Sequence, residues 1–165
     1  MTVIVQEPAP VLRKKAHDVP ADLIGSKQLN DWIEQMSTAL AKEDDGVAIA
    51  APQIGVPYRI FVVSHKASKK FDKDLVFINP EIIRLGKHKE ELTEGCLSVR
   101  WKYGLVKRAT TATVRALNPE GNEFVMPGRG LLAQIFQHET DHLNGVLFID
   151  KARNIEDVPP SQQDA

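Results

Sequence analysis

Hydrophobic residues recur at helical spacing in two parts of the chain. The first part has apolar side chains at Leu29, Trp32, Ile33, Met36 and Leu40. Because residues three or four positions apart share one face of a helix, this pattern predicts an amphipathic helix over Leu29–Lys42. The following Asp44-Asp45-Gly46 is typical of a helix end.

The second amphipathic segment runs from Gly130 to Gly145, where Asn144-Gly145 forms a C-terminal stop. On a helical projection, one narrow stripe contains Leu131, Ile135, His138 and His142. Beside it lie Leu132, Phe136, Glu139 and Leu143, and on the opposite side lie Ala133, Gln137 and Thr140. The apolar stripe is expected to face the core, so the two histidines are predicted to point away from solvent.

Short runs of β-branched and aromatic residues predict strands between these helices. Arg59–Ser64 and Leu75–Asn79 are such runs, and the polar span Lys66–Asp74 between them is predicted to be a loop. Further along, Thr111–Leu117 and Glu123–Met126 flank a turn-rich stretch and predict an antiparallel hairpin.

The order of these elements is helix, several strands, then one helix, which predicts an α+β domain rather than alternating βαβ units. We expect short antiparallel or mixed sheets that pack around the C-terminal helix, with one further helix near the N-terminus. Residues 1–150 are predicted to form a single domain, and residues 151–165 a short polar tail that is mobile at its end.

Composition is consistent with one soluble globular domain. The chain has 165 residues, of which 42% are hydrophobic and 26% charged. A net charge of −1 gives no electrostatic basis for direct binding to nucleic acid or to an anionic membrane. No apolar run is long enough to span a bilayer, and residues 1–10 do not resemble a secretory signal.

The chain contains one cysteine, Cys96, which excludes an intrachain disulfide. A single cysteine in a chain with conspicuous histidines favours a reducing compartment and a metal-binding or catalytic role. The alternative is a buried structural thiol, which is the usual fate of a free cysteine.

The clearest candidate chemistry is the H-E-x-x-H motif at residues 138–142. On a helix, His138 and His142 lie on one face and are placed to bind one metal ion, with Glu139 beside it to move protons. The alternative is that both are core histidines with hydrogen-bond partners. The motif supplies two ligands, whereas catalytic sites of this kind usually have three. Asp150 and Glu156 downstream are conceivable carboxylate ligands, and Cys96 lies upstream.

Three motifs occur in order along the chain: Gly46–Gln53 (GVAIAAPQ), Glu94–Ser98 (EGCLS) and Gln137–His142 (QHETDH). Together they resemble the peptide deformylase family, which carries G-x-G-x-A-A-x-Q, E-G-C-L-S and Q-H-E-x-D-H. Pro10–Arg13 and Asp141–Phe148 extend the resemblance to about residues 8 to 150. Three motifs in register are much more specific than H-E-x-x-H alone.

The resemblance implies that Cys96, His138 and His142 hold one divalent metal, with water or hydroxide in the fourth position. It implies Fe²⁺ as the native metal, with Zn²⁺ or Ni²⁺ as alternatives, because these donors do not select among such metals by affinity alone. A thiolate and two neutral imidazoles leave the metal a net positive charge, so it remains a Lewis acid.

The implied reaction is the removal of the formyl group from the N-terminal methionine of new proteins. Metal-bound hydroxide attacks the formyl carbon, and Glu139 passes the proton to the leaving amine. The Gln53 amide and the Leu97 backbone N–H are implied to stabilise the developing oxyanion. The products are formate and a free N-terminus. Without the resemblance, Gln53 would be an ordinary surface amide.

Residues near the motifs are implied to line the pocket for the methionine side chain. They are Val47, Ala48, Leu131 and Ile135, which would otherwise be assigned to the core. Ala48, Arg100 and Gln134 depart from the family pattern, where a glycine, a proline and a basic or aliphatic residue are usual. The Ala48 methyl group is expected either to narrow the cleft or to be tolerated. The bulky basic stretch that begins at Arg100 is expected to reshape one wall and to weaken turnover of long formyl-peptides relative to short ones.

Charged residues around the motifs have two interpretations each. By the resemblance, Glu94 supports the cysteine loop through an ion pair with Arg108; otherwise it is a solvated charge. Asp141 either orients the site or is an acid on the helix surface.

Two other functions agree with part of the pattern: a metallopeptidase, and a metal-stabilised protein that binds modified N-termini without hydrolysis. Cys96 as third ligand argues against the first, and the presence of Glu139 and Gln53 argues against the second. The expected partners are N-formylmethionyl nascent peptides, with transient ribosome contact, and the expected location is the cytoplasm.

Overall fold

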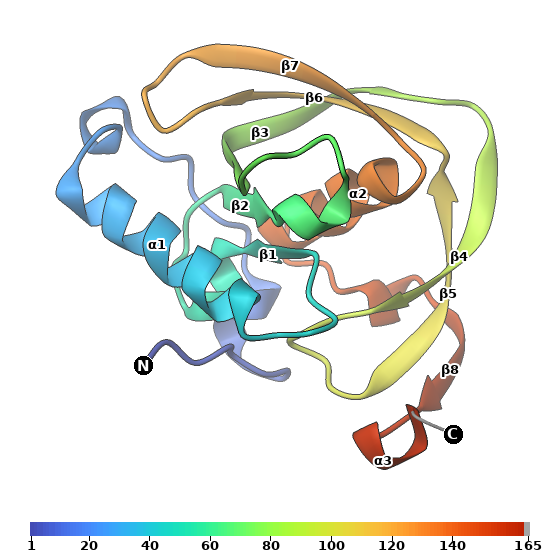
Figure 1. Ribbon diagram of the computed structural model, residues 1–165. Coiled ribbons are helices and arrows are strands. Elements are labelled where there is room, and N and C mark those ends of the chain that lie inside the picture. Colours follow the sequence, from blue (N-terminus) through green and yellow to red (C-terminus); the bar gives the residue numbers. More distant parts are fainter. Residues whose placement is uncertain (164–165) are drawn as a thin grey trace.

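In the computed structural model, which describes residues 1–163, two antiparallel sheets surround a C-terminal helix (Figure 1). One sheet has the strand order β1-β2-β3-β6-β7, and the other has β4-β5-β8. The strands are β1 (Ala48–Ala50), β2 (Ile60–Val63), β3 (Leu75–Leu85), β4 (Lys89–Gly95), β5 (Lys102–Ala109), β6 (Thr111–Leu117), β7 (Glu123–Arg129) and β8 (Arg153–Asp157). The predicted α+β architecture is therefore confirmed.

The helices include the two that hydrophobic spacing predicted. They are α1 (Lys27–Ala41), α2 (Leu131–Leu143) and the short α3 (Pro160–Gln163), with 3₁₀ turns at η1 (Pro10–Arg13), η2 (Ala21–Leu23), η3 (Ala51–Ile54), η4 (His65–Ala67) and η5 (Phe148–Asp150). Helix α1 begins two residues before the predicted start, because the Ser26 hydroxyl accepts a hydrogen bond from the Leu29 N–H at 3.1 Å and caps the first turn.

Two long stretches of chain cross from one sheet to the other. β3 continues into β4 around Gly86, and β5 continues into β6 around Thr110. The corner stays paired: the Gly86 N–H donates to the Thr111 carbonyl at 2.9 Å, and the Thr110 N–H donates to the His88 carbonyl at 3.0 Å. A Cβ atom at Gly86 would lie 2.1 Å from Thr111 Oγ1, so a larger residue here would force the Thr111 side chain to move.

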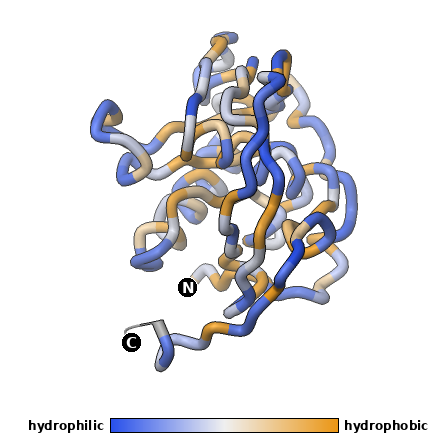
Figure 2. The backbone as a smooth tube through the Cα atoms, turned by 90° about the vertical axis from the view of Figure 1, so that its right-hand side faces the viewer, coloured by the Kyte–Doolittle hydropathy of each residue, from blue (hydrophilic) through white to orange (hydrophobic). Residues whose placement is uncertain are grey.

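The β4–β5 ribbon carries the cysteine motif at its end. Figure 2 faces this ribbon and shows that hydrophilic residues cover much of it. Strand β8 lies inside the predicted polar tail and pairs with β5, with Lys102 opposite Asp157 and Leu105 opposite Arg153. Residues 164 and 165 of that tail lie outside the described part of the chain.

One hydrophobic cluster lies between α2 and the five-stranded sheet, and a second lies between α1 and the opposite face of that sheet. Phe61 on β2 stacks on Phe77 on β3 with ring centroids 4.6 Å apart, and Phe136 of α2 lies 5.4 Å from Phe77. Ala133 and Gln137 were predicted to lie opposite the core-facing stripe, yet both are buried. The prediction that α2 has one buried face and one exposed face is wrong for these two residues, because sheet and loops enclose the helix on nearly every side (Figure 1).

None of the helices in residues 1–163 combines the length and apolar character needed to cross a membrane.

Candidate metal centre

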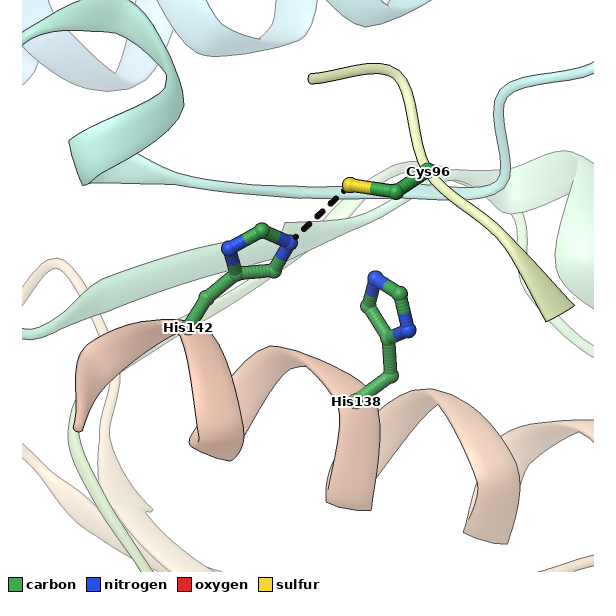
Figure 3. A group of neighbouring side chains, drawn as sticks. All are labelled: Cys96, His138 and His142. Atoms are coloured by element: carbon green, nitrogen blue, oxygen red, sulfur yellow. Dashed lines mark hydrogen bonds between the residues drawn. The ribbon is translucent and has the colours of Figure 1, made fainter. Parts of the chain in front are cut away.

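Helix α2 places His138 and His142 one turn apart on the same face. Their ring centroids lie 5.0 Å apart, and both side chains rise from the helix toward Cys96 (Figure 3). The helix is bounded by Gly130 and Gly145, both with positive φ, as the sequence predicted. A Cβ atom at Gly145 would lie 2.5 Å from the Arg13 carbonyl oxygen, so glycine lets the chain leave α2 against the N-terminal segment.

Cys96 follows the last residue of β4 and faces the two imidazoles. Its Sγ atom lies 3.2 Å from His142 Nε2 (Figure 3), and one donor atom from each of Cys96, His138 and His142 falls within 4.8 Å of the others. Sulfur and imidazole nitrogen are the donors that zinc and iron-group metals bind. The group therefore fits one divalent metal ion.

Hydrogen bonds within the cysteine loop and from two other segments hold it in place. The Ser98 N–H points to Cys96 Sγ at 3.4 Å, and the Ser98 hydroxyl accepts from Gln53 Nε2 at 3.1 Å. From the N-terminal segment, the Glu7 N–H donates to the Ser98 carbonyl and Gln6 Nε2 donates to the Leu97 carbonyl, both at 2.8 Å. These contacts fix the thiol before any metal binds.

The predicted ion pair between Glu94 and Arg108 is confirmed and buried. Arg108 Nε and Nη2 donate to the two oxygens of Glu94 at 2.7 and 2.9 Å, which is a bidentate pair. Arg108 Nη1 also donates to Asp141 at 2.7 Å, so Asp141 helps to hold the Arg108 side chain that pairs with Glu94. Burial raises the pKa of Glu94, but hydrogen bonds from Arg108 and His138 outweigh it and lower the pKa to about 2.

Glu94 also sets the orientation of one metal ligand. Its Oε1 atom lies 2.8 Å from His138 Nδ1, which leaves His138 Nε2 to face the cysteine. A carboxylate behind the imidazole in this way fixes the ring and strengthens it as a ligand. The network thus runs from Asp141 through Arg108 and Glu94 to His138.

Without a metal, the pKa values of the two histidines are shifted in opposite directions. Burial first, and the neighbouring His138 second, lower the pKa of His142 well below 6.5, so its imidazole is neutral and ready to bind a metal. Burial lowers the pKa of His138 as well, but its interactions with Cys96 and Glu94 raise it well above 6.5 overall. Metal binding must therefore displace a proton from His138.

Glu139 is a buried carboxylate, 4% exposed, beside this group. Within the described residues its Oε2 atom has no hydrogen-bond partner. Burial raises the pKa of Glu139 to about 7, although His138 acts in the opposite direction. A carboxyl group with a pKa near neutrality is suited to exchange protons during a reaction.

A cavity of about 260 Å³ opens onto these groups. The residues predicted to bind substrate line it, together with the predicted oxyanion donors: Val47, Ala48, Gln53, Leu97, Leu131 and Ile135. Gln53 is 1% exposed, which excludes the surface-amide interpretation. Leu131 is 47% exposed, so its predicted core position is wrong; the first turn of α2 lies at the cavity mouth instead.

The two carboxylates considered as third ligands lie elsewhere. Asp150 accepts hydrogen bonds from Arg13 at 2.6 Å and from the Leu147 N–H at 3.0 Å. Glu156 is exposed on β8, opposite Tyr103 of β5. Neither of these conceivable ligands belongs to the group of metal donors, and Cys96 supplies the third donor.

Gln137 also supports the site, although no role for it was predicted from the sequence. The Gln137 amide accepts from the Ala109 N–H at 3.0 Å and donates to the Ala109 and Ala133 carbonyls, both at 2.9 Å. It ties α2 to the end of β5. Its place beside His138 in the motif was visible, but its partners on another strand were not.

Comparisons with known proteins agree with this site. The polypeptide deformylase family model matches residues 1–158. Similar curated proteins include the peptide deformylase of Desulforudis audaxviator, 41% identical over 155 residues that cover 92% of this chain and 94% of the relative. The peptide deformylase of Carboxydothermus hydrogenoformans is 50% identical over 112 residues, 67% of this chain and 69% of the relative.

Solved structures show the same fold. An actinonin-bound class I type b peptide deformylase from Acinetobacter baumannii aligns with a TM-score of 0.85 and 31% identity, over 93% of this chain and 99% of that one. Peptide deformylase from Thermotoga maritima aligns with a TM-score of 0.83 and 35% identity, over 93% and 98% of the two chains.

Proposed function

The chain belongs to the peptide deformylase family and is a metal-dependent hydrolase of that kind, and we propose how its own residues divide the work. The observation that carries the proposal is the meeting of three metal donors within 4.8 Å beside the buried carboxylate of Glu139. A divalent metal held by these donors would supply a Lewis acid that lowers the pKa of water at the site toward 7.

Glu139 is the proton carrier in this proposal. Its carboxylate accepts the proton of the attacking water and returns it to the methionine nitrogen as the formyl C–N bond breaks. Burial keeps its pKa near 7, which allows both steps. A bound metal lowers that pKa and favours the ionised form that starts the reaction.

Gln53 and the Leu97 N–H are proposed to stabilise the charge that develops on the formyl oxygen. The Gln53 amide is fixed at both ends: its oxygen accepts from the Ala50 N–H at 2.9 Å, and its Nε2 lies 3.1 Å from Ser98 Oγ and 3.6 Å from Cys96 Sγ. This geometry places a rigid donor beside the metal ligands, as charge stabilisation requires.

Replacing Gln53 with alanine is expected to lower kcat by about 10²-fold, because an oxyanion donor is lost from a buried site. Metal content should stay at the wild-type level, since Gln53 is not a ligand. Steady-state formate release and metal analysis measure the two quantities. Gln28→Ala, at an exposed amide on α1, is the matched control. A Gln53→Ala enzyme with wild-type kcat would remove Gln53 from the mechanism.

The substrate proposed for the cavity is an N-formylmethionyl peptide. Val47, Leu131 and Ile135 provide apolar walls for an unbranched side chain, and Ala48 also lines the cavity, where it would lie beside the peptide backbone. The cavity opens to solvent near Leu131, which leaves room for the rest of a peptide. We further propose that the protein works in the cytoplasm on nascent chains, with transient ribosome contact.

Fe²⁺ is proposed as the native metal, and this gives a testable sensitivity to oxygen. Protein purified without oxygen should contain about one iron per chain and should lose activity in air, because a ferrous ion and the partly exposed Cys96 thiolate are both oxidisable. Metal analysis and formate release before and after exposure measure this. Reconstitution with Ni²⁺ should give an air-stable enzyme. A fully active anaerobic preparation that contains only zinc would contradict the iron proposal.

A further inference from the structure

Arg100 joins two segments that line the substrate cavity. Its Nη1 atom donates to Asp45 at 2.9 Å and its Nη2 atom donates to Glu43 at 2.5 Å. The guanidinium carbon also lies 4.2 Å from the ring centroid of Trp101. The Arg100 side chain is only 18% exposed, so it is held by these three contacts rather than extended into solvent.

The two joined segments form different walls of the cavity. Residues 43–46 lead directly into Val47 and Ala48, and residues 97–101 follow the metal ligand Cys96. The two segments also lie close together at Gly46, where an added Cβ atom would be 3.4 Å from Leu97 Cδ1. Arg100 adds a second connection, further from the metal.

This connection lies at the outer part of the cavity. Asp45 precedes Val47 by two residues and its side chain is 49% exposed, while Arg100 follows Cys96 by four residues. No hydrogen bond or ion pair of the described residues joins Arg100 to Gln53 or Glu139. A peptide bound with its formyl group at the metal would lie in the cavity that these two segments help to line.

We propose that Arg100 is a positioning residue that sets the width of the outer cleft and so determines how tightly the residues after methionine are bound. This inference rests on the proposed function and extends it to extended formyl-peptides. Without the guanidinium, Glu43 and Asp45 would face each other with Asp44 beside them, and their mutual repulsion would move residues 43–46 outward. An arginine shared by two carboxylates also orders three side chains at once.

Arg100→Ala is expected to raise the KM for formyl-Met-Ala-Ser about three- to tenfold and to leave kcat within about twofold, since binding outside the reacting centre is lost. The KM for formyl-methionine, which does not reach the outer cleft, should not change. Arg100→Lys keeps one carboxylate partner and should give an intermediate KM. A role in folding alone would not separate the two substrates in this way.

The double variant Glu43→Gln/Asp45→Asn provides an independent test if Arg100→Ala folds poorly. It removes both ion pairs without leaving carboxylates that repel each other, so it should raise the KM for formyl-Met-Ala-Ser by less than Arg100→Ala does, and adding Arg100→Ala to it should have no further effect. Arg115→Ala is the matched control, because Arg115 on β6 forms a 2.8 Å ion pair with Glu81 on β3 of the five-stranded sheet.

An unchanged KM in both the Arg100→Ala and the Glu43→Gln/Asp45→Asn enzymes would overturn the inference. So would an equal rise for formyl-methionine and formyl-Met-Ala-Ser. If the metal-loaded wild-type protein released no formate from either substrate, the proposed function itself would fail, and that result is distinct from a failure of the Arg100 inference.

Discussion

Replacing Glu139 with alanine is expected to lower kcat by about 10²- to 10⁴-fold while the protein keeps its metal, which is the range that loss of a general acid-base group produces. The physical reason is the position of the carboxylate. It is buried beside Cys96, His138 and His142, and its Oε2 atom has no partner within the described residues. A buried acceptor is unfavourable for folding, so its presence here indicates a chemical task.

Glu139→Gln separates proton transfer from shape, because glutamine occupies the same space without an ionisable group. It should be as inactive as Glu139→Ala. Glu156→Ala removes an exposed carboxylate on β8 and should retain full activity. Initial rates of formate release and metal per chain are the measurements. A Glu139→Ala enzyme with normal activity and normal metal content would show that proton transfer occurs elsewhere.

Replacing Cys96 with alanine is expected to lower metal affinity by more than about 10²-fold, because second-sphere partners of a ligand are already worth 10- to 100-fold. Activity should fall with metal occupancy. The remaining His138 and His142 form only a two-donor site. Competition with a chromophoric chelator measures the affinity directly.

Two variants make the Cys96 result specific. Cys96→Ser keeps the size of the side chain but replaces a soft sulfur donor by oxygen, and it should also bind metal weakly. Asp150→Asn changes the carboxylate that the sequence left open as a ligand, and it should bind metal normally because Asp150 bonds to Arg13 instead. Stoichiometric metal in Cys96→Ala together with loss of metal in Asp150→Asn would reverse the ligand assignment.

The predictable parts of the fold are those in which one face is buried. α1 and α2 have apolar residues at helical spacing, and the β6–β7 hairpin has a turn of the expected type, so all three were predicted. Strand β4 (KEELTEG) was not, because most of its side chains are exposed and charged. β8 is exposed along its whole length, and only its pairing with β5 makes it a strand.

The metal site was likewise only partly predictable from the sequence. Helical spacing alone predicted that His138 and His142 share a face, and it left the third ligand open between Cys96, Asp150 and Glu156. The resemblance selected Cys96, and the path of β4 explains how a residue 42 positions upstream of His138 comes to face it.

Other contacts between segments far apart in the sequence could not be predicted from it. Arg100 was recognised as a departure from the family pattern, but its carboxylate partners, 55 and 57 positions away, were not. The same holds for Gln137, whose amide bonds to β5. Spacing within one element is encoded locally, whereas such pairings follow from topology.

The central claim is that this site hydrolyses the formyl amide and not the peptide bonds beside it. The most direct measurement is the product analysis of formyl-Met-Ala-Ser treated with metal-loaded wild-type protein, by a formate assay and mass spectrometry of the peptides. We expect one formate for each intact Met-Ala-Ser, and no Ala-Ser. Cleavage after methionine, or no formate from protein with a filled metal site, would contradict it.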